Sequence, residues 1–164
     1  MTHWEAVIAS PKETAARFTW ARTEQARFER DAMEDEPLVD AYEAGSRSAA
    51  PPVDAATGAA LRFLAASIGA RSVVEVGTGC GASGIWLLRG MAPGGILTTV
   101  DTNAAYQDYA RSAFSRAGFG PGRARLIRGA ALEVLPRLTD GGYDLVFVDA
   151  DTASYPLYLD EALR

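Results

Sequence analysis

The stretch Ser72-Val73-Val74-Glu75-Val76-Gly77-Thr78-Gly79-Cys80-Gly81-Ala82-Ser83-Gly84 changes character along its length. The β-branched run from Ser72 to Val76 predicts a strand, and the residues from Ile85 to Met91 predict a helix. The glycines between them can adopt positive φ angles and let a ligand approach the backbone. A loop of this kind after a parallel strand predicts a ligand cradle. The alternative is a tight turn whose glycines serve packing only.

Strand and helix patterns alternate through most of the chain. After a helix from Asp54 to Ile68, the expected strands are Ser72–Val76, Ile96–Val100, Ala124–Arg128 and Tyr143–Val148. The expected helices that follow them are Ser83–Met91, Asn103–Ala117, Ala130–Leu138 and Tyr155–Arg164. This alternation predicts an α/β fold, a Rossmann-like doubly wound parallel sheet with strand order 3-2-1-4. In the helix from Asp54, one face collects Ala56, Ala60, Phe63, Leu64 and Ser67.

Residues 1–52 have a different composition and are interpreted as an N-terminal helical segment, separate from a domain at 53–164. Two charge-rich segments, Lys12–Arg30 and Asp31–Asp40, are interrupted by prolines and precede a stretch of small residues, Gly45–Pro52. The first of these segments has a thin apolar stripe, formed by Phe18, Ala21, Gln25 and Phe28. It predicts one or two surface helices, packed lightly on a core or on a second subunit. A partly frayed terminus is the alternative.

The composition of the 164 residues limits the class of partner. A net charge of -5, with a single lysine and no arginine stripe, argues against nucleic-acid binding. No run of 18 apolar residues occurs, and the first twenty residues include Glu5, Lys12, Glu13 and Arg17 rather than an apolar core, so we expect no membrane segment. The single cysteine, Cys80, excludes an internal disulfide and fits a reducing compartment. These features predict a cytoplasmic protein.

Acidic residues end two of the expected strands. Asp101 would lie beside the glycine loop, where its carboxylate can accept both hydroxyls of a ribose; capping the next helix is the alternative role. Asp149 and Asp151 follow the last strand and are expected to point the same way. Unpaired, they would raise each other's pKa, so a metal, an ammonium or a sulfonium is a plausible partner.

The loop also satisfies a dinucleotide fingerprint. Gly79-Cys80-Gly81-Ala82-Ser83-Gly84 reads G-x-G-x-x-G, and Asp101 follows at the usual interval of about 20 residues. This reading predicts an NAD(P)-dependent oxidoreductase. However, Gly77-Thr78 separates the fingerprint from the strand, and Glu75 has no role in it.

Three motifs together resemble a known family. Val74-Glu75-Val76-Gly77-Thr78-Gly79, Asp101 and Val146-Phe147-Val148-Asp149-Ala150-Asp151 are similar to class I S-adenosylmethionine-dependent O-methyltransferases, the group with caffeoyl-CoA and catechol O-methyltransferases and their bacterial members. The resemblance covers residues 53–164. It implies that S-adenosylmethionine is the cofactor, with the methyl group passing to a hydroxyl of a small-molecule acceptor.

The resemblance also implies a role for individual residues. The methionine end of the cofactor would lie against Val53, Glu75, Gly77, Thr78 and Ser83, within the loop that includes Gly79 and Gly81. The ribose would meet Asp101 and Thr102, and the adenine would lie near Ala130. Asp151 would meet the charged amino-acid end of the cofactor. Asp149 would be a metal or substrate ligand.

The sequence departs from the family in two respects. Thr152 stands where the family has a lysine that assists the acceptor hydroxyl, and the Asp-Asn pair that completes the family's metal site is not found. We therefore expect no tightly bound divalent metal ion, because one carboxylate is a poor magnesium site. A catalytically silent cofactor-binding or interface protein is a third hypothesis.

The last expected strand would lie at an unpaired edge of the sheet. Leu145-Val146-Phe147-Val148 is an unbroken apolar run, and no strand follows that could pair with it. The chain is therefore interpreted either as a fragment that lacks the C-terminal strands of the family or as one half of a homodimer. We expect a second copy over this edge or a disordered terminal helix.

Overall fold

The computed structural model describes residues 35–164, so the expected helix at Lys12–Arg30 lies outside the described residues. The described part contains one parallel sheet in the order β3-β2-β1-β4, which confirms the topology expected from the sequence. Its strands are β1 Ser72–Val76, β2 Ile96–Asp101, β3 Ala124–Arg128 and β4 Leu145–Val148. None of the helices formed by these residues is long and apolar enough to cross a membrane.

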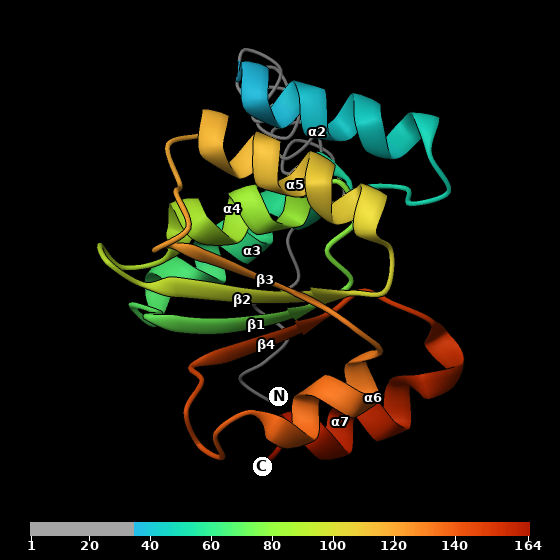
Figure 1. Cartoon of the computed structure of the whole chain (residues 1–164). Helices are drawn as coiled ribbons and strands as arrows, with labels where there is room; N and C mark the ends of the chain where they lie inside the picture. The colour runs from blue at the N-terminus through green and yellow to red at the C-terminus, as the bar shows by residue number, and fades with distance from the viewer. Residues whose placement is uncertain (1–34) are drawn as a thin grey trace, which may run out of the picture.

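Helices lie on both faces of the sheet (Figure 1). One face carries α2 Glu36–Arg47, α3 Ala55–Ser67, α4 Ala82–Gly90 and α5 Ala104–Arg116. The other carries α6 Ala131–Val134, the 3-10 turn η2 Leu135–Arg137 and α7 Tyr155–Ala162, which follows a second 3-10 turn, η3 Thr152–Ser154. The structure therefore has the layered, doubly wound arrangement that alternating strands and helices predict.

Each strand divides its side chains between two cores. In β1, Val73 packs in the larger core with Leu87 and Phe114, whereas Val74 and Val76 face the smaller one beneath α6 and α7. The division follows from the period of two in a strand. Glu75 shares a face with Val73 and is completely buried, so a carboxyl group is placed where the pattern calls for an apolar side chain.

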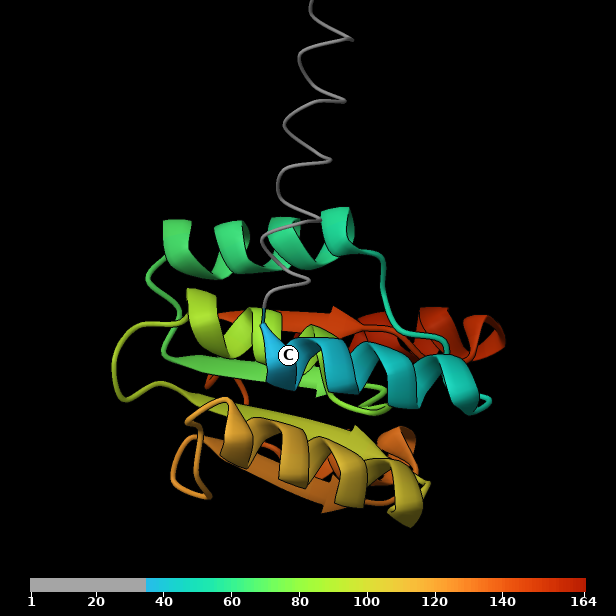
Figure 2. The same cartoon turned by 90° about the horizontal axis from the view of Figure 1, so that it is seen from above.

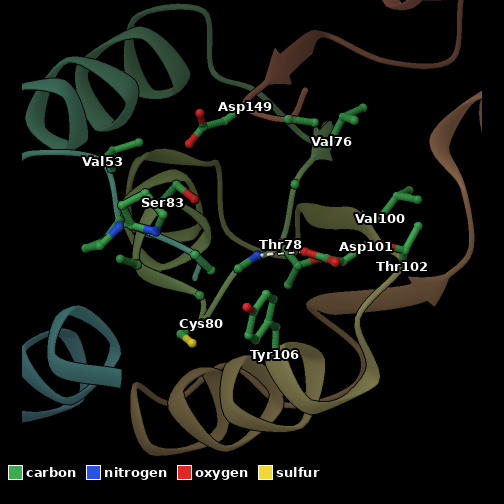
Figure 3. Close-up of a pocket in the computed structure, with 18 of the residues that line it drawn as sticks. Val53, Val76, Thr78, Cys80, Ser83, Val100, Asp101, Thr102, Tyr106 and Asp149 are labelled. Atoms are coloured by element: carbon green, nitrogen blue, oxygen red, sulfur yellow. Dashed lines mark hydrogen bonds between the residues drawn. The ribbon is translucent and has the colours of Figure 1, made fainter. Parts of the chain in front are cut away.

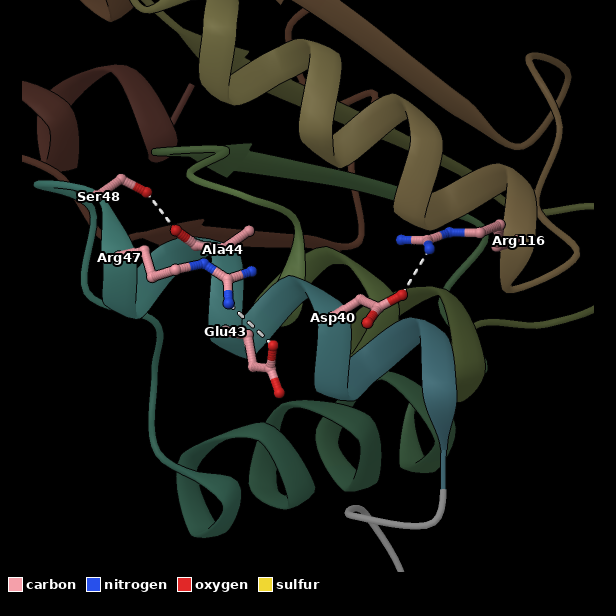
Figure 4. A network of polar contacts seen from close by, with 6 residues as sticks. All are labelled: Asp40, Glu43, Ala44, Arg47, Ser48 and Arg116. Atoms are coloured by element: carbon pink, nitrogen blue, oxygen red, sulfur yellow. Dashed lines mark hydrogen bonds and ion pairs between the residues drawn. The ribbon is translucent and has the colours of Figure 1, made fainter.

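Two prolines moved helix boundaries away from the expected ones. Pro37, one of the prolines expected to interrupt the charge-rich N-terminal segments, occupies the first turn of α2, where its missing N–H has no intrahelical partner to lose. Helix α2 then continues beyond Gly45 and is tied to α5 by an ion pair between Asp40 and Arg116 (Figure 4). Pro136 shortens the expected helix Ala130–Leu138 to α6 followed by a 3-10 turn.

The β4 edge has no neighbour among residues 35–164. Leu145 and Phe147 pack against the larger core and Val146 and Val148 against the smaller one, as expected for the two faces of this strand. Helix α7 forms, so the expected disorder of the terminal helix is wrong. Coverage of the edge by a second copy stays a prediction.

Candidate cofactor site

A cavity of about 460 Å³ opens at the carboxyl ends of the strands. Its position follows from the register, because Val76 of β1 pairs with Val100 of β2 and with Val148 of β4. The loops after these three strands therefore meet at one edge of the sheet, the usual ligand edge of open α/β folds. Figure 3 shows Val53 and Asp149 toward one end of the cavity and Asp101 and Tyr106 toward the other.

The glycine loop forms the floor of this cavity, and its glycines are needed for two reasons. Gly77, Gly79 and Gly81 have φ angles of 98, 48 and 97 degrees, which residues with a side chain rarely adopt. A Cβ atom on Gly77 would also lie 2.0 Å from the carbonyl oxygen of Asp149. The loop thus comes so close to the end of β4 that no side chain fits at Gly77.

Asp101 holds the loop against the end of β2. Its Oδ2 accepts a 3.0 Å hydrogen bond from the N–H of Gly79, and its Oδ1 accepts one of 2.8 Å from the N–H of Asn103. The side chain that caps α5 belongs to Asn103, which accepts from the N–H groups of Ala105 and Tyr106. Asp101 is therefore not the helix cap, and each of its oxygens retains a lone pair for another donor.

A chain of buried polar groups lies behind the loop. The carboxylate of Glu75 accepts hydrogen bonds of 2.6 Å from Ser83 Oγ and from Thr99 Oγ1. Thr99 also contacts the hydroxyl of Thr78 at 2.8 Å. Burial raises the pKa of Glu75 to about 7, an increase that the two hydrogen bonds only partly offset and that the charges of Asp149 and Asp101 enlarge. Glu75 thus supports the loop from beneath.

The expectation that Asp149 and Asp151 raise each other's pKa is wrong. The pKa of Asp149 is raised by partial burial at the cavity. The pKa of Asp151 is lowered instead, first by a 2.6 Å hydrogen bond from the hydroxyl of Tyr158 and then by the Ser154 side chain. Because Asp151 also caps η3, its carboxylate is turned toward α7 rather than paired with Asp149.

Most of the residues expected from the sequence meet at this cavity. Those that line it are Val53, Gly77, Thr78, Gly79, Gly81, Ser83, Asp101, Thr102, Asp149 and Asp151. Two do not: Glu75 lies beneath the loop with no exposed surface, and Ala130 lies between two lining residues, Gly129 and Ala131.

Other lining residues were not anticipated. They include the connection between α2 and α3, residues Ala49 to Pro52, and two aromatic residues, Tyr106 and Tyr158. Tyr106 lies within the expected helix Asn103–Ala117, and the sequence motifs gave it no role at the site. Its position in the first turn after Asp101 was the available signal, because the start of that helix must face the same sheet edge.

The described residues do not supply a complete metal site. Among residues 35–164, no three side chains of His, Cys, Asp or Glu gather closely enough to hold an ion. Asp149 would therefore offer a metal ion only one carboxylate from these residues, whereas magnesium prefers six oxygen ligands.

A parallel sheet in the order 3-2-1-4, with a glycine cradle and an acidic residue at adjacent strand ends, defines a Rossmann-like domain, a class whose members bind nucleoside-containing ligands at this edge. Residues 30–164 match the O-methyltransferase family. The chain belongs to this family. It is 50% identical over 136 residues to a protein named as an O-methyltransferase in Mycolicibacterium smegmatis, covering 83% of this chain and 65% of the relative.

Two solved structures show the same likeness. An O-methyltransferase from Bacillus cereus, in complex with SAH, is 32% identical with a TM-score of 0.72, over 79% of this chain and 60% of that one. TomG from Streptomyces achromogenes, in complex with SAM, is 33% identical with a TM-score of 0.73. This match covers 85% of this chain and 68% of TomG. The chain thus spans less than two thirds of the length of several relatives that it matches.

Proposed function

We propose that the protein is an S-adenosylmethionine-dependent O-methyltransferase that methylates a hydroxyl group of a small-molecule acceptor. The observation that carries this proposal is the cradle at the ligand edge of the sheet. The cradle forms where the glycine loop at Gly77 meets the end of β4, beside Asp101. The NAD(P) alternative leaves Glu75 and its buried hydrogen bonds without a role, and the relatives carry the name O-methyltransferase rather than the name of an oxidoreductase.

The residues present fit this cofactor. Asp101 has free lone pairs for ribose hydroxyls, next to Thr102, and the first N–H groups of α4, from Ala82 onward, have no intrahelical acceptors. Val53, Thr78 and Ser83 would contain the methionine end, supported from beneath by Glu75. The adenine would lie beside Ala130, at the start of α6.

The described residues would act by position and charge. When bound, the cofactor supplies an electrophilic methyl group on a cationic sulfonium. The carboxyl groups of Asp149 and Asp151 belong to residues that line the cavity. In the proposed complex, Asp151 would lie near the amino-acid end of the cofactor and Asp149 near the acceptor. Holding the reacting atoms close and in line is expected to provide most of the rate. Thr152, in η3, cannot serve as the general base that the family's lysine provides.

Ligand-dependent thermal stability tests the proposal. S-adenosylhomocysteine should raise the melting temperature of the chain, because a ligand that binds only the native state stabilises it, and NADH should not. A shift with NADH alone would instead support the oxidoreductase. Cofactor binding without methyl transfer to any member of a panel of hydroxyl compounds would support the silent binding protein, for which the replacement by Thr152 is the favouring observation.

We further propose that residues 53–164 form the main cofactor-binding unit, that the N-terminal helical segment, residues 1–52, adds Ala49 to Pro52 to the wall of its cavity, and that the protein is a cytoplasmic homodimer. The β4 edge, which no strand within residues 35–164 pairs with, supports a second copy, because unpaired backbone groups on an apolar strand favour pairing. Cys80 is the single cysteine and can form no disulfide within the chain, which fits a reducing compartment. The net charge of -5 supports a small-molecule acceptor rather than a nucleic acid or a membrane surface.

A further inference from the structure

Thr99 is a buried residue of β2 that lies behind the cavity and does not line it. Its hydroxyl contacts that of Thr78 at 2.8 Å and the carboxylate of Glu75 at 2.6 Å. Ser83 reaches the other carboxylate oxygen of Glu75 from α4, which lies between α3 and α5 on the larger-core face of the sheet (Figure 2). These four side chains form one hydrogen-bond network, and its two ends, Thr78 and Ser83, line the cavity (Figure 3).

The direction of each hydrogen bond in the network follows from the number of protons available. A carboxylate can only accept, so Thr99 and Ser83 each donate their single hydroxyl proton to ionised Glu75. Thr99 then has no proton left for Thr78, so Thr78 is the donor in the contact between them. The protons of both cavity-lining hydroxyls are thereby directed inward. Toward the cavity, Thr78 and Ser83 offer only oxygen lone pairs.

Protonation of Glu75 reverses part of the network. A proton on the oxygen near Ser83 is donated to Ser83, whose own proton is then free to point into the cavity. A proton on the oxygen near Thr99 is donated to Thr99, which then donates to Thr78 and frees the proton of Thr78. In either case one cavity hydroxyl becomes a donor. An ammonium group therefore meets two acceptors only when Glu75 is ionised.

The surroundings of Glu75 place this change of protonation near neutral pH. Burial raises its pKa to about 7, and the two hydrogen bonds offset this increase only in part. Among residues 35–164, the charged groups that act on it are Asp149, after β4, and Asp101, at the end of β2, and both raise the pKa further. The only charged residue of α4, Arg89, pairs with Asp35 instead. A cation brought into the cavity favours loss of the proton.

We infer that Thr99 is a positioning residue through which the cavity selects the ammonium group at the amino-acid end of the cofactor. It holds the hydroxyl of Thr78 as an acceptor toward the cavity and stabilises the ionised form of Glu75. When the ammonium group binds, the O–H bond of protonated Glu75 breaks and its proton passes to the solvent. This inference rests on the proposed function, because the ligand is the S-adenosyl cofactor.

Titration calorimetry of the wild-type chain with S-adenosylhomocysteine tests the proton release. At about pH 6, heats measured in two buffers of different ionisation enthalpy should show nearly one proton released for each ligand bound, and at about pH 8 they should show little release. The affinity should fall by up to about tenfold per pH unit below pH 7, since ionised Glu75 is the binding form. A pH-independent affinity without proton release would overturn the inference.

A second ligand isolates the ammonium group. The analogue of S-adenosylhomocysteine in which hydrogen replaces the amino group keeps the adenosine, the sulfur and the carboxylate, but it presents no ammonium group to the network. Its affinity for the wild type should not fall below pH 7. An equal fall for both ligands would overturn the inference, because the pH dependence would then not come from recognition of the ammonium group.

The substitution Thr99→Val removes the hydroxyl at nearly constant volume. Because the hydrogen bond from Thr99 lowers the pKa of Glu75, its loss should shift the midpoint of the affinity profile to higher pH and weaken binding at pH 7 by about tenfold or more. Thr99→Ser keeps the hydroxyl and should restore the wild-type profile. Thr98→Val is the matched control. Thr98 is also buried but faces the opposite side of β2, so its profile should match the wild type.

The outcomes separate this inference from the proposed function. An unshifted midpoint in Thr99→Val with native near-UV circular dichroism would overturn the inference alone, because Thr99 would then serve packing only. The proton release and the analogue are measured on the wild type, so both stay decisive if Thr99→Val does not fold. Failure of S-adenosylhomocysteine to bind the wild type at any pH would refute the proposed function and the inference together.

Discussion

The hydroxyl of Ser83, at the wall of the cavity, donates a 2.6 Å hydrogen bond to the carboxylate of Glu75, which has no exposed surface. The cavity is thereby connected to a titratable group that water does not reach. Since burial raises the pKa of Glu75 to about 7, its protonation state is expected to change within the physiological pH range.

We expect the stability of the protein to fall as the pH rises from about 4.5 to about 7. With a pKa of 4.5 when unfolded and about 7 when folded, Glu75 binds more protons in the folded state over that interval. The difference amounts to about 3 kcal/mol in the free energy of unfolding. Urea unfolding at several pH values should show this slope in the wild type and a much smaller one in Glu75→Gln.

The pKa of Asp149 is also raised, so Asp149 contributes a decrease in stability with rising pH in both the wild type and Glu75→Gln. The difference between the two pH profiles therefore isolates the contribution of Glu75. Parallel pH profiles for wild type and Glu75→Gln would show that Glu75 keeps an ordinary pKa.

The substitution Asp101→Ala should weaken binding of S-adenosylhomocysteine by about 1.5–3 kcal/mol, the cost of a hydrogen bond to a charged acceptor. Titration calorimetry measures it. Asn103→Ala is the control, because Asn103 caps α5 and its loss should cost about 1 kcal/mol of stability with little effect on affinity. Equal affinities of wild type and Asp101→Ala would remove the ribose role from Asp101.

The substitution Gly77→Ala should destabilise the domain by more than about 3 kcal/mol, because its Cβ would overlap the backbone of Asp149. Gly118→Ala provides the comparison. Gly118 has a similar φ of 85 degrees but no atom within 4 Å of the added Cβ, so only backbone strain of about 1–2 kcal/mol is expected. Similar losses for the two variants, measured by chemical unfolding, would contradict a close approach of the loop to β4.

The substitution Tyr158→Phe should raise the pKa of Asp151, because the phenol hydroxyl is the first of the groups that lower it. Carboxyl carbon chemical shifts followed through an acid titration would measure the change. Tyr155→Phe, which alters another tyrosine of α7, should leave the titration of Asp151 as it is. An unchanged pKa in Tyr158→Phe would mean that the cap of η3 alone holds the Asp151 side chain.

The strand order and the location of the cradle could be predicted from sequence because they depend on local patterns. The run Val73 to Val76 favours a strand whatever surrounds it, and the glycines after it permit the backbone angles that a tight loop needs. Alternation of strands and helices with right-handed crossovers then leaves few topologies. Asp101 could be placed at the cradle for the same reason, since β1 and β2 end at the same edge.

Other features were decided only by contacts between distant parts of the chain. The orientation of α3 depends on the fit of Gly58 against Trp86, and the lowered pKa of Asp151 depends on Tyr158. The depth of Glu75 likewise required α4 to cover β1. Backbone preference is a property of neighbouring residues and can be read along the chain. Burial and the electrostatic environment are properties of packing, so they exist only once the helices have closed on the sheet.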